Sequence, residues 1–417
     1  MKHISHLAEL GHLFRPGCRV VMHSACAAPP RLGAQLVELA QVQGPFELFD
    51  LTTIGNPTYV SGVAAGSLKL STFVPGRAVR SALRAGCVTV LRRPLSAAPS
   101  LLADGTIGVD VLLLHVSPPD AEGRMSLGVS CDAMRAALSR DPVVVVEVNE
   151  GMPRTFGTTS IDSDEVDHWL EGDGSPVTVA PATGDATDDA IADHVAGLIR
   201  NGDVLQTGIG SIPDLTASRL THLRDLGIHT GIITDAVQTL IERGVVTNAG
   251  KTEFHGKSVA TLAGGSAAFY RFLDGNPDIV FIPCDESHDA ARLARIPQLC
   301  AINGALEIDL HGRINAESAD GQQVSAPGGQ PDFARGASAS AGGKSIIALR
   351  ATSKDGATSR IVRSLAPGAN VTISTQIVDY VVTEHGVARV AGLSGIQLAT
   401  ALADIAAPEF RSNLRRT

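Results

Sequence analysis

Short apolar runs rich in Val, Ile and Leu recur along the chain, and stretches with helical spacing separate them. The runs are apolar on both faces, which is typical of parallel or mixed strands that helices cover on both sides. Strands that alternate with helices favour an α/β architecture. The predicted strands lie at residues 87–91, 109–114, 143–148, 204–206, 279–282, 345–349 and 380–382.

The length of 417 residues suits two domains better than a single core. A polar segment at 171–189, rich in Gly, Pro and Thr, is the predicted linker. We therefore predict two α/β domains, 1–185 and 186–417, each an open, mostly parallel sheet covered by helices. With 44% apolar and 18% charged residues, the chain has enough apolar material for both cores, and global disorder is excluded.

A helix is predicted directly after the linker, with Thr187 as its N-cap. Its apolar face consists of Ile191, Val195, Leu198 and Ile199. Farther along, residues 316–343 form a Gly/Ser/Ala-rich stretch that is long for a connection inside a compact domain. We expect that stretch to be either functional or mobile.

The charge and cysteine patterns exclude several classes of protein. The net charge is −9 and the basic residues are scattered, so no nucleic-acid surface is expected. The six cysteines lack CxxC spacing and fit the reduced thiols of a cytoplasmic protein. The 13 histidines show no metal-ligand spacing with Cys or Asp, so no metal site is predicted. No run approaches the roughly 18 apolar residues of a membrane span, and no signal peptide is expected.

A glycine-rich turn carries the first candidate functional groups. Gly208 and Gly210 follow a predicted strand, and Ile212 and Pro213 come next, with Pro213 in the first turn of the following helix. Such glycines let backbone N–H groups approach an anion or a carbonyl oxygen, although a tight turn explains the pattern equally well. The absence of a third glycine excludes a dinucleotide-binding fingerprint.

Two further segments contain candidate groups. The paired glycines Gly328 and Gly329 stand beside Asp332, and they suit either a backbone oxyanion donor or a flexible turn. Glu384 ends an apolar strand, which is where an open α/β sheet holds ligand groups. A surface glutamate is the alternative interpretation of that residue.

Taken together, these segments resemble the acetyl-CoA hydrolase/transferase family, most closely its 4-hydroxybutyrate CoA-transferase branch. The matching motifs follow one another in order along nearly the whole chain. In the N-terminal half they lie at 27–30, 116–120, 123, 127–130 and 147–149. In the C-terminal half they lie at 208–214, 302–303, 307–309, 328–330, 332–333, 342–348, 382–384 and 407–411.

The resemblance implies two CoA-transferase-like domains with the active site in the cleft between them, a homodimer, and acyl-CoA as the substrate that brings coenzyme A. Members use a glutamate that attacks the acyl-CoA and passes through an acyl-glutamyl anhydride to a glutamyl-CoA thioester. The resemblance assigns an oxyanion-donating N–H to Gly329 and an assisting carboxylate to Glu384. It places the acyl group near Cys26 and Ala27. The candidates for holding coenzyme A are Gly208, Gly210, Ile212, Pro213, Gly328 and Lys344.

The chain departs from the family at the nucleophile. Relatives have His-Ser/Thr-Glu where this chain has His-Thr-Gly at 229–231, so Gly231 occupies the position of the attacking glutamate. Counting back from Asn303 places His288 at the family's assisting asparagine. We expect a retained CoA scaffold with rebuilt chemistry. In it, the missing glutamate empties volume beside the thioester and admits a larger acceptor.

Direct acyl transfer is the main hypothesis for that chemistry, with an alcohol, an amine or water attacking the thioester carbonyl. His288 is the predicted base, since an imidazole titrates near neutrality. Glu384 orients His288 or acts in its place, and the N–H of Gly329 stabilises the oxyanion.

Two alternatives stay open. In one, coenzyme A moves between an acyl-CoA and a carboxylate through a substitute nucleophile, for which the candidates are Asp235, Glu384, Glu286 and Cys26. Such a group must come within about 3–3.5 Å of the carbonyl carbon, and a cysteine needs a depressed pKa. In the other alternative, the chain is a non-catalytic homologue that binds CoA esters.

Overall fold

The computed structural model describes residues 1–172, 174–319 and 321–415, and the chain forms two compact units. The first unit combines Met1–Ala180 with Val259–Ser287, and the second combines Pro181–Ser258 with His288–Thr417. Sequence analysis placed one boundary at 185/186, and nothing in the pattern indicated that 259–287 pack with the first unit.

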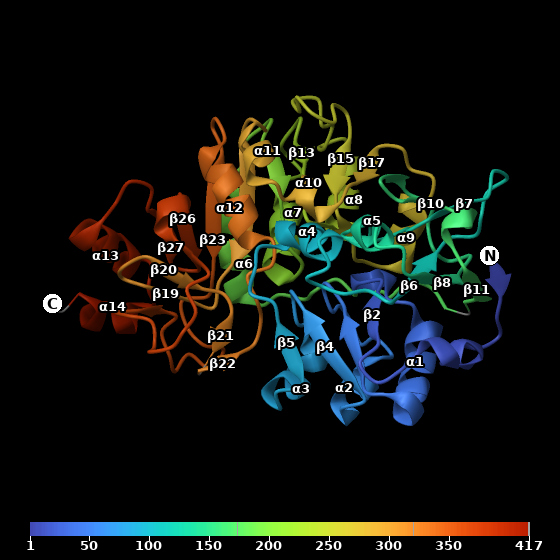
Figure 1. The fold of residues 1–417 in the computed structure, drawn as a ribbon. Helices are drawn as coiled ribbons and strands as arrows, with labels where there is room; N and C mark the ends of the chain where they lie inside the picture. The colour runs from blue at the N-terminus through green and yellow to red at the C-terminus, as the bar shows by residue number, and fades with distance from the viewer. Residues whose placement is uncertain (173, 320, 416–417) are drawn as a thin grey trace. The chain divides into compact units, whose positions relative to one another are not determined.

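The first unit is built on one parallel sheet, which has eight strands within the described residues. All neighbouring strands run parallel, in the order β1-β11-β8-β6-β2-β3-β4-β5, and Figure 1 shows β4 and β5 side by side. These strands are β1 Lys2–His3, β2 Arg19–Met22, β3 Phe46–Phe49, β4 Leu68–Thr72, β5 Val88–Val90, β6 Val111–Val116, β8 Val143–Val148 and β11 His168–Glu171.

The first long helix, α1, is fixed to this sheet at its N-terminus. The carboxylate of Glu147 on β8 accepts hydrogen bonds from the N–H groups of Arg31 and Leu32, each at 2.9 Å, and so satisfies two free donors of the first turn. Leu32 and Leu36 then pack into the core. The helices of this unit are α1 Pro30–Gln43, α2 Val60–Ala65, α3 Arg80–Arg84, α4 Ala98–Ala103, α5 Met134–Leu138, α9 Ala267–Leu273 and α10 Cys284–Ser287.

Backbone pairing explains why 259–287 belong to the first unit. Strand β17 (Ile279–Phe281) pairs in parallel with β9 (Phe156–Gly157), and the N–H of Cys284 donates to the carbonyl of Asp132 at 2.9 Å. The remaining short strands of the chain are β7 Arg124–Ser126, β10 Ser160–Asp162, β14 Ile232–Ile233, β15 Ser258–Ala260, β16 Leu262–Ala263, β21 Ser318–Ala319 and β22 Gln322–Gln323.

The second unit contains a larger sheet in the order β13-β12-β18-β23-β26-β27. Its strands run parallel except for β27, which forms an antiparallel hairpin with β26. These strands are β12 Val204–Gln206, β13 Gly227–Ile228, β18 Leu299–Gly304, β23 Lys344–Ala348, β26 Tyr380–Thr383 and β27 Gly386–Arg389. A smaller sheet consists of β24 Ile361–Val362, β19 Glu307–Asp309, β20 Arg313–Asn315 and β25 Ile373–Ser374.

The helices of the second unit pack on these sheets through two apolar clusters, one of which includes Val204 of β12 and Phe333 of α12. They are α6 Ala186–Ala196, α7 Ser211–Arg219, α8 Asp235–Glu242, α11 Ala290–Ala294, α12 Gln330–Ala339, α13 Gly395–Asp404 and α14 Pro408–Leu414. In the described part of the chain, no helix has the length and apolar character needed to cross a membrane.

The predicted α/β fold is confirmed, and each apolar run predicted as a strand forms one. Among the described residues of the two large sheets, eight strands were not predicted, namely β1, β2, β3, β4, β11, β13, β18 and β27. In β3 and β4 the exposed side chains of Glu47 and Lys69 interrupt the apolar run, so the sequence there lacks the continuous pattern of a fully buried strand.

One local prediction was wrong. The N-cap of α6 is Asp185 instead of Thr187, because the Asp185 carboxylate accepts hydrogen bonds from the N–H groups of Thr187 and Asp188 at 3.0 and 3.1 Å. The stretch 316–343 was expected to be functional or mobile, and that expectation stays a prediction. The stretch contains α12, whose apolar face is buried despite its high Gly and Ser content.

Candidate functional site

A pocket lies at the carboxyl ends of β12, β18 and β23 in the second unit. It has a volume of about 240 Å³. Open α/β sheets hold ligands at this edge. The residues that line the pocket are Gly208, Ile209, Gly210, Ser211, Ile212, Pro213, Ile302, Asn303, Gly304 and Ala348. Four of the predicted CoA-binding residues, Gly208, Gly210, Ile212 and Pro213, are therefore brought together here.

The glycine loop of this pocket has an exposed backbone. Gly210 has a φ of 133°, which L side chains rarely adopt, and it immediately precedes α7. A Cβ added at Gly208 or Gly210 would meet nothing within 4 Å. Pro213 lies in the first turn of α7, as predicted. The loop therefore offers open space next to backbone N–H groups at the start of a helix, which suits an anionic or carbonyl ligand group.

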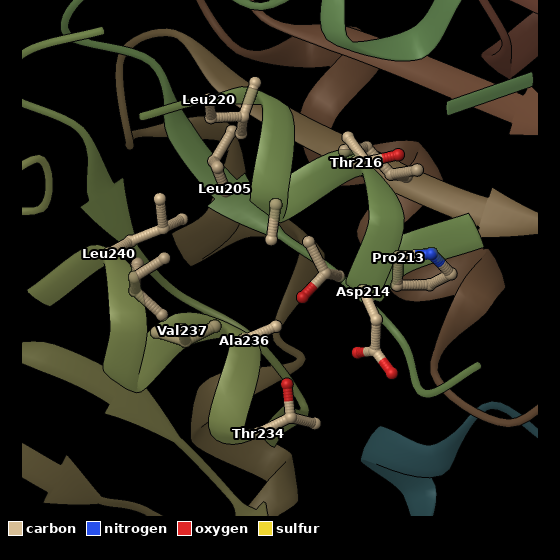
Figure 2. Close-up of a pocket in the computed structure, with 13 residues that line it drawn as sticks. Leu205, Pro213, Asp214, Thr216, Leu220, Thr234, Ala236, Val237 and Leu240 are labelled. Carbon is tan, nitrogen blue, oxygen red and sulfur yellow. The ribbon is translucent and has the colours of Figure 1, made fainter. Parts of the chain in front are cut away.

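A small apolar cavity under α7 shows how that helix is held. Figure 2 shows Leu205 of β12, Leu220, and Val237 and Leu240 of α8 around it, with Pro213 and Asp214 at its side. Its volume of about 10 Å³ has room for no more than one water molecule. This cavity is a packing space that seats α7 on β12 and α8.

The register of β13 on β12 places Gly231 next to the glycine loop. The N–H of His229 donates to the carbonyl of Leu205 at 3.0 Å, which continues the pairing of the two strands. The hydroxyl of Thr230 donates to the carbonyl of Thr207 at 2.8 Å and accepts from the N–H of Thr207 at 3.3 Å. The turn that carries Gly231 is therefore tied to the residue that precedes Gly208.

The imidazole of His288 fills the space beside Gly231. A Cβ added to Gly231 would lie 2.9 Å from Nε2 of His288, and one added to Gly329 would lie 2.6 Å from the same atom. The ring meets the ring of Phe333 edge-on, with centroids 4.8 Å apart. The expectation that the missing glutamate leaves empty volume is therefore wrong, because His288 occupies it.

Burial changes the chemistry expected of His288. The residue is only 1% exposed, and burial lowers the pKa of its imidazole to about 3. The expectation that it titrates near neutrality is corrected accordingly. At neutral pH the ring is uncharged, so it can both donate and accept a hydrogen bond.

The paired glycines lie at the start of α12, against the same imidazole. Gly328 has a φ of 56°, which favours glycine, and Gly329 is the N-cap of α12. Among the described residues, no protein acceptor is found for the N–H of Gly329. Gly231, Gly329 and His288 therefore form one compact cluster. The role of the Gly329 N–H as an oxyanion donor stays a prediction.

Glu384 occupies the two-residue turn between β26 and β27. One of its carboxylate oxygens accepts from the N–H of Ala351 at 2.9 Å, and the other lies 3.7 Å from Nε2 of His385. These contacts hold the carboxylate against its own hairpin and the end of β23. The predicted role of Glu384 in orienting His288 has no contact of this kind to support it.

Lys344 lies far from the glycine loop along the strands. It is the first residue of β23, and therefore lies at the amino edge of the parallel sheet, whereas the pocket is at the carboxyl edge. Its ammonium forms an ion pair of 2.6 Å with the buried carboxylate of Asp203. We therefore remove Lys344 from the candidate CoA-binding residues and assign it a structural role.

Cys26 and Ala27 lie in the first unit, in a short 3₁₀ turn that is completely buried. The preceding residue, Ala25, has a φ of 56°. Burial raises the pKa of the Cys26 thiol to about 11, and the nearby Tyr270 hydroxyl offsets only part of that effect. Cys26 is therefore a thiol at neutral pH, without the depressed pKa that a nucleophile needs.

The other candidate nucleophiles are placed differently. Asp235 is the first residue of α8, at the end of the helix where a carboxylate is favoured electrostatically. Glu286 is exposed on α10 of the first unit. Sequence analysis missed Phe333, Asn248 and Lys251, which contact the cluster or its supporting strand. Phe333 belongs to the motif at 332–333 that resembles the family, but no role was assigned to it.

Comparison with known families gives two matches. Residues 1–181 match the acetyl-CoA hydrolase/transferase N-terminal domain, and residues 265–417 match the C-terminal domain of the same family. The 4-hydroxybutyrate coenzyme A transferase of Clostridium kluyveri is 35% identical over 95% of this chain and 92% of its own length. The succinyl-CoA:cyclohexane-1-carboxylate CoA transferase of Geobacter metallireducens is 38% identical over 86% of this chain and 82% of its own.

Solved structures agree with these matches. RipA of Yersinia pestis superposes with a TM-score of 0.93 at 32% identity, covering 99% of this chain and 96% of that one. The 4-hydroxybutyrate CoA-transferase of Porphyromonas gingivalis gives a TM-score of 0.84 at 33% identity with the same coverage.

Proposed function

Because the chain belongs to the acetyl-CoA hydrolase/transferase family, we propose that it passes the acyl group of an acyl-CoA directly to an acceptor, without a glutamyl-CoA intermediate. Membership makes the chain an enzyme that uses acyl-CoA in transfer or hydrolysis, since its relatives are CoA transferases and acetyl-CoA hydrolases. The proposal concerns which group attacks the thioester carbonyl. The acceptor is an alcohol, an amine or water.

The observation that carries this proposal is the contact between Gly231 and His288. Gly231 has no side chain to attack with, and the ring of His288 lies within 3.2 Å of any Cβ at that position through both Nε2 and Cε1. A carboxylate therefore has neither a residue to carry it nor a space to occupy at position 231. In the proposed reaction the attacking group therefore comes from outside the chain.

Two groups of the cluster support such an attack. The N–H of Gly329 is available to the developing oxyanion, and a donor of this kind typically lowers the activation barrier by about 3–4 kcal/mol. The neutral imidazole of His288 hydrogen-bonds the acceptor and accepts its proton late, when attack has made the acceptor acidic. An imidazole with a pKa of about 3 is a weak base before that point.

The glycine loop is the proposed binding site for part of the coenzyme A. Its first residue, Gly208, directly follows Thr207, which is hydrogen-bonded to the turn of Gly231. The pocket of about 240 Å³ accommodates one segment of coenzyme A. The residues that fit this role are Gly208, Gly210, Ile212 and Pro213, and Gly328, which does not line the pocket, stays a prediction from the resemblance.

Transfer of coenzyme A through a substitute nucleophile is the weaker candidate. The raised pKa of Cys26 keeps that group protonated, and the carboxylate of Glu384 is held by the N–H of Ala351. Asp235 sits at a helix N-terminus, where it stabilises α8. Acyl binding at Cys26 and Ala27 and homodimerisation stay predictions from the resemblance, and a cytoplasmic location stays a prediction from the cysteine pattern.

The decisive experiment supplies the purified protein with a panel of acyl-CoAs, with and without a second carboxylate, and follows free coenzyme A and acyl-CoA identity by liquid chromatography and mass spectrometry. We expect free coenzyme A without exchange. Movement of coenzyme A onto the added carboxylate, together with a covalent enzyme adduct, would overturn the proposal. A rise in melting temperature with acyl-CoA but no turnover would favour a non-catalytic homologue.

A further inference from the structure

We propose that Asn248 and Lys251 are positioning residues, which hold the turn at 229–231 in place by binding both polar groups of the Ile228 backbone. The N–H of Ile228 donates to Oδ1 of Asn248 at 2.8 Å. The carbonyl of Ile228 accepts from Nζ of Lys251, also at 2.8 Å. Nothing in the sequence pattern assigned a role to either side chain.

The location of Ile228 explains why side chains are needed there. Strand β13 is the edge of its sheet, and one side of it pairs with β12. On its other side, Leu226 pairs with Val246 and accepts from the N–H groups of Thr247 and Asn248. Beyond that point the chain turns away, and the two side chains take over the hydrogen bonds that a neighbouring strand would supply.

Both side chains are themselves fixed from behind. Asn248 has a φ of 55°, a conformation that Asn tolerates better than most residues. Its amide nitrogen donates to the hydroxyl of Ser258 at 3.1 Å, which sets the direction of Oδ1. Lys251 directs a second N–H to the carbonyl of Lys257 at 2.8 Å. We call the pair of Asn248 and Lys251 the clamp on Ile228. Both of its side chains are held by hydrogen bonds to residues other than Ile228.

A lysine at this depth is costly, which argues for a specific role. Lys251 is only 3% exposed, and burial lowers the pKa of its ammonium to about 7, with Glu253 nearby opposing that effect. An apolar side chain would pack there without the desolvation cost of an amine. What the amine group adds beyond packing is its hydrogen bonds to the two backbone carbonyls of Ile228 and Lys257.

Ile228 lies three residues before Gly231, so the position of Ile228 affects the position of Gly231. Ile228 is followed by His229 and Thr230, and the hydroxyl of Thr230 anchors the turn to Thr207 on the opposite side. The position of Gly231 against His288 depends on both anchors. Because a displacement of about 1 Å can cost on the order of a hundredfold in rate, a loosened Ile228 should slow the reaction. This consequence for the rate rests on the proposed function.

The first test measures hydrogen exchange of backbone amides by mass spectrometry and needs no activity. In Lys251→Met and Asn248→Gly, we expect the peptide covering 226–233 to exchange about tenfold faster than in the wild type, since a lost acceptor or donor opens the edge strand. Asn248→Gly keeps the positive φ without strain. Asn248→Asp keeps an oxygen that can accept from the N–H of Ile228, and Lys251→Arg keeps N–H donors, so both should restore part of the protection.

The matched control is Arg313→Met, which removes a side chain paired with the buried carboxylate of Asp309 in the other sheet of the same unit. It should lower the melting temperature without faster exchange at 226–233. Wild-type protection of that peptide in Lys251→Met and Asn248→Gly would overturn the proposal, whatever the activity.

The second test is kinetic. Lys251→Met should lower kcat about tenfold or more with KM changed less than about threefold, because the clamp positions the site and does not bind substrate. Arg313→Met should keep the wild-type kcat below its melting temperature. If the wild type turns over no acyl-CoA, the proposed function fails and the exchange data still decide the positioning role. An unchanged kcat in an active Lys251→Met enzyme would overturn that role.

Discussion

The imidazole of His288 lies between Gly231 and Gly329, with its Nε2 atom 2.9 and 2.6 Å from the points where their Cβ atoms would be. A side chain at either glycine would force the ring of His288 to shift, since both Cβ contacts with Nε2 are shorter than 3 Å. The identities of the three residues are therefore coupled. A glycine at 231 is compatible with the histidine at 288, whereas a carboxylate at 231 requires the ring of His288 to move or a smaller residue at 288.

The first prediction concerns Gly231→Glu. The single variant should melt at a lower temperature, since overpacking a filled site typically costs about 1–3 kcal/mol. It should also form no covalent adduct. The double variant Gly231→Glu with His288→Asn removes the clashing ring and should regain stability. Under acyl-CoA turnover with a carboxylate, it should show a covalent enzyme adduct by mass spectrometry. A stable, adduct-forming single variant would disprove the coupling.

The second prediction concerns the reaction of the wild type. His288→Ala should lower the rate of acyl-CoA turnover by on the order of a hundredfold, which is typical of a lost acid–base group. The matched control is His222→Ala, because His222 is an exposed histidine of the same unit. Initial rates of free coenzyme A release measure both. Equal rates in His288→Ala and the wild type would remove His288 from the mechanism.

The third prediction concerns acid stability. Burial lowers the folded-state pKa of His288 to about 3, whereas an unfolded histidine titrates near about 6.5. The stabilising contribution is therefore complete above about pH 6.5 and is lost as the pH falls toward 3. His288→Asn should lessen the slope of stability against pH in this window by up to about 1.4 kcal/mol per pH unit.

Chemical denaturation at several pH values between 4 and 7 checks the sign. The same reasoning predicts that the rate of the wild type shows no inflection near pH 6.5 from this histidine. Identical slopes for His288→Asn and the wild type would show that the ring is not held neutral by burial.

The sequence identified the glycine loop and the individual residues of the cluster more readily than the contact of His288 with Gly231 and Gly329. The glycine loop at 208–213 was predictable, because a strand, two glycines and a helix-starting proline follow one another locally. His288 was found only by counting from Asn303. Its burial between Gly231 and Gly329 depends on the register of β13 on β12 and on where α12 begins, and no local pattern encodes either.

Lys344 shows the opposite error. The sequence named Lys344 as a candidate for holding coenzyme A, but the amino and carboxyl edges of a parallel sheet are separated by the length of its strands. Only the strand bounds, with Lys344 first in β23 and Ala348 last, place the ammonium at the wrong edge. The clamp of Asn248 and Lys251 was equally hidden, because it consists of side-chain bonds to the backbone of an edge strand.

The fourth prediction concerns the glycine loop. Gly210→Ala forces a non-glycine residue to a φ of 133° and should cost about 1–3 kcal/mol or shift the loop. Its affinity for coenzyme A should fall. Gly208→Ala is the matched control for strain, because Gly208 has no such φ and its Cβ would meet open space. Titration calorimetry with coenzyme A and melting temperatures measure both effects. Equal stability of the two variants would contradict the strain at Gly210.

The last prediction separates structure from ligand binding at Lys344. Lys344→Met leaves the carboxylate of Asp203, which is 2% exposed, without its ammonium partner. Breaking a buried pair in this way typically costs about 3 kcal/mol, because one charge stays buried and uncompensated. Lys344→Met with Asp203→Asn should recover part of that loss, since the amide carries no charge. The affinity for coenzyme A should stay at the wild-type value in both variants. A variant that keeps its melting temperature but loses affinity would return Lys344 to the ligand site.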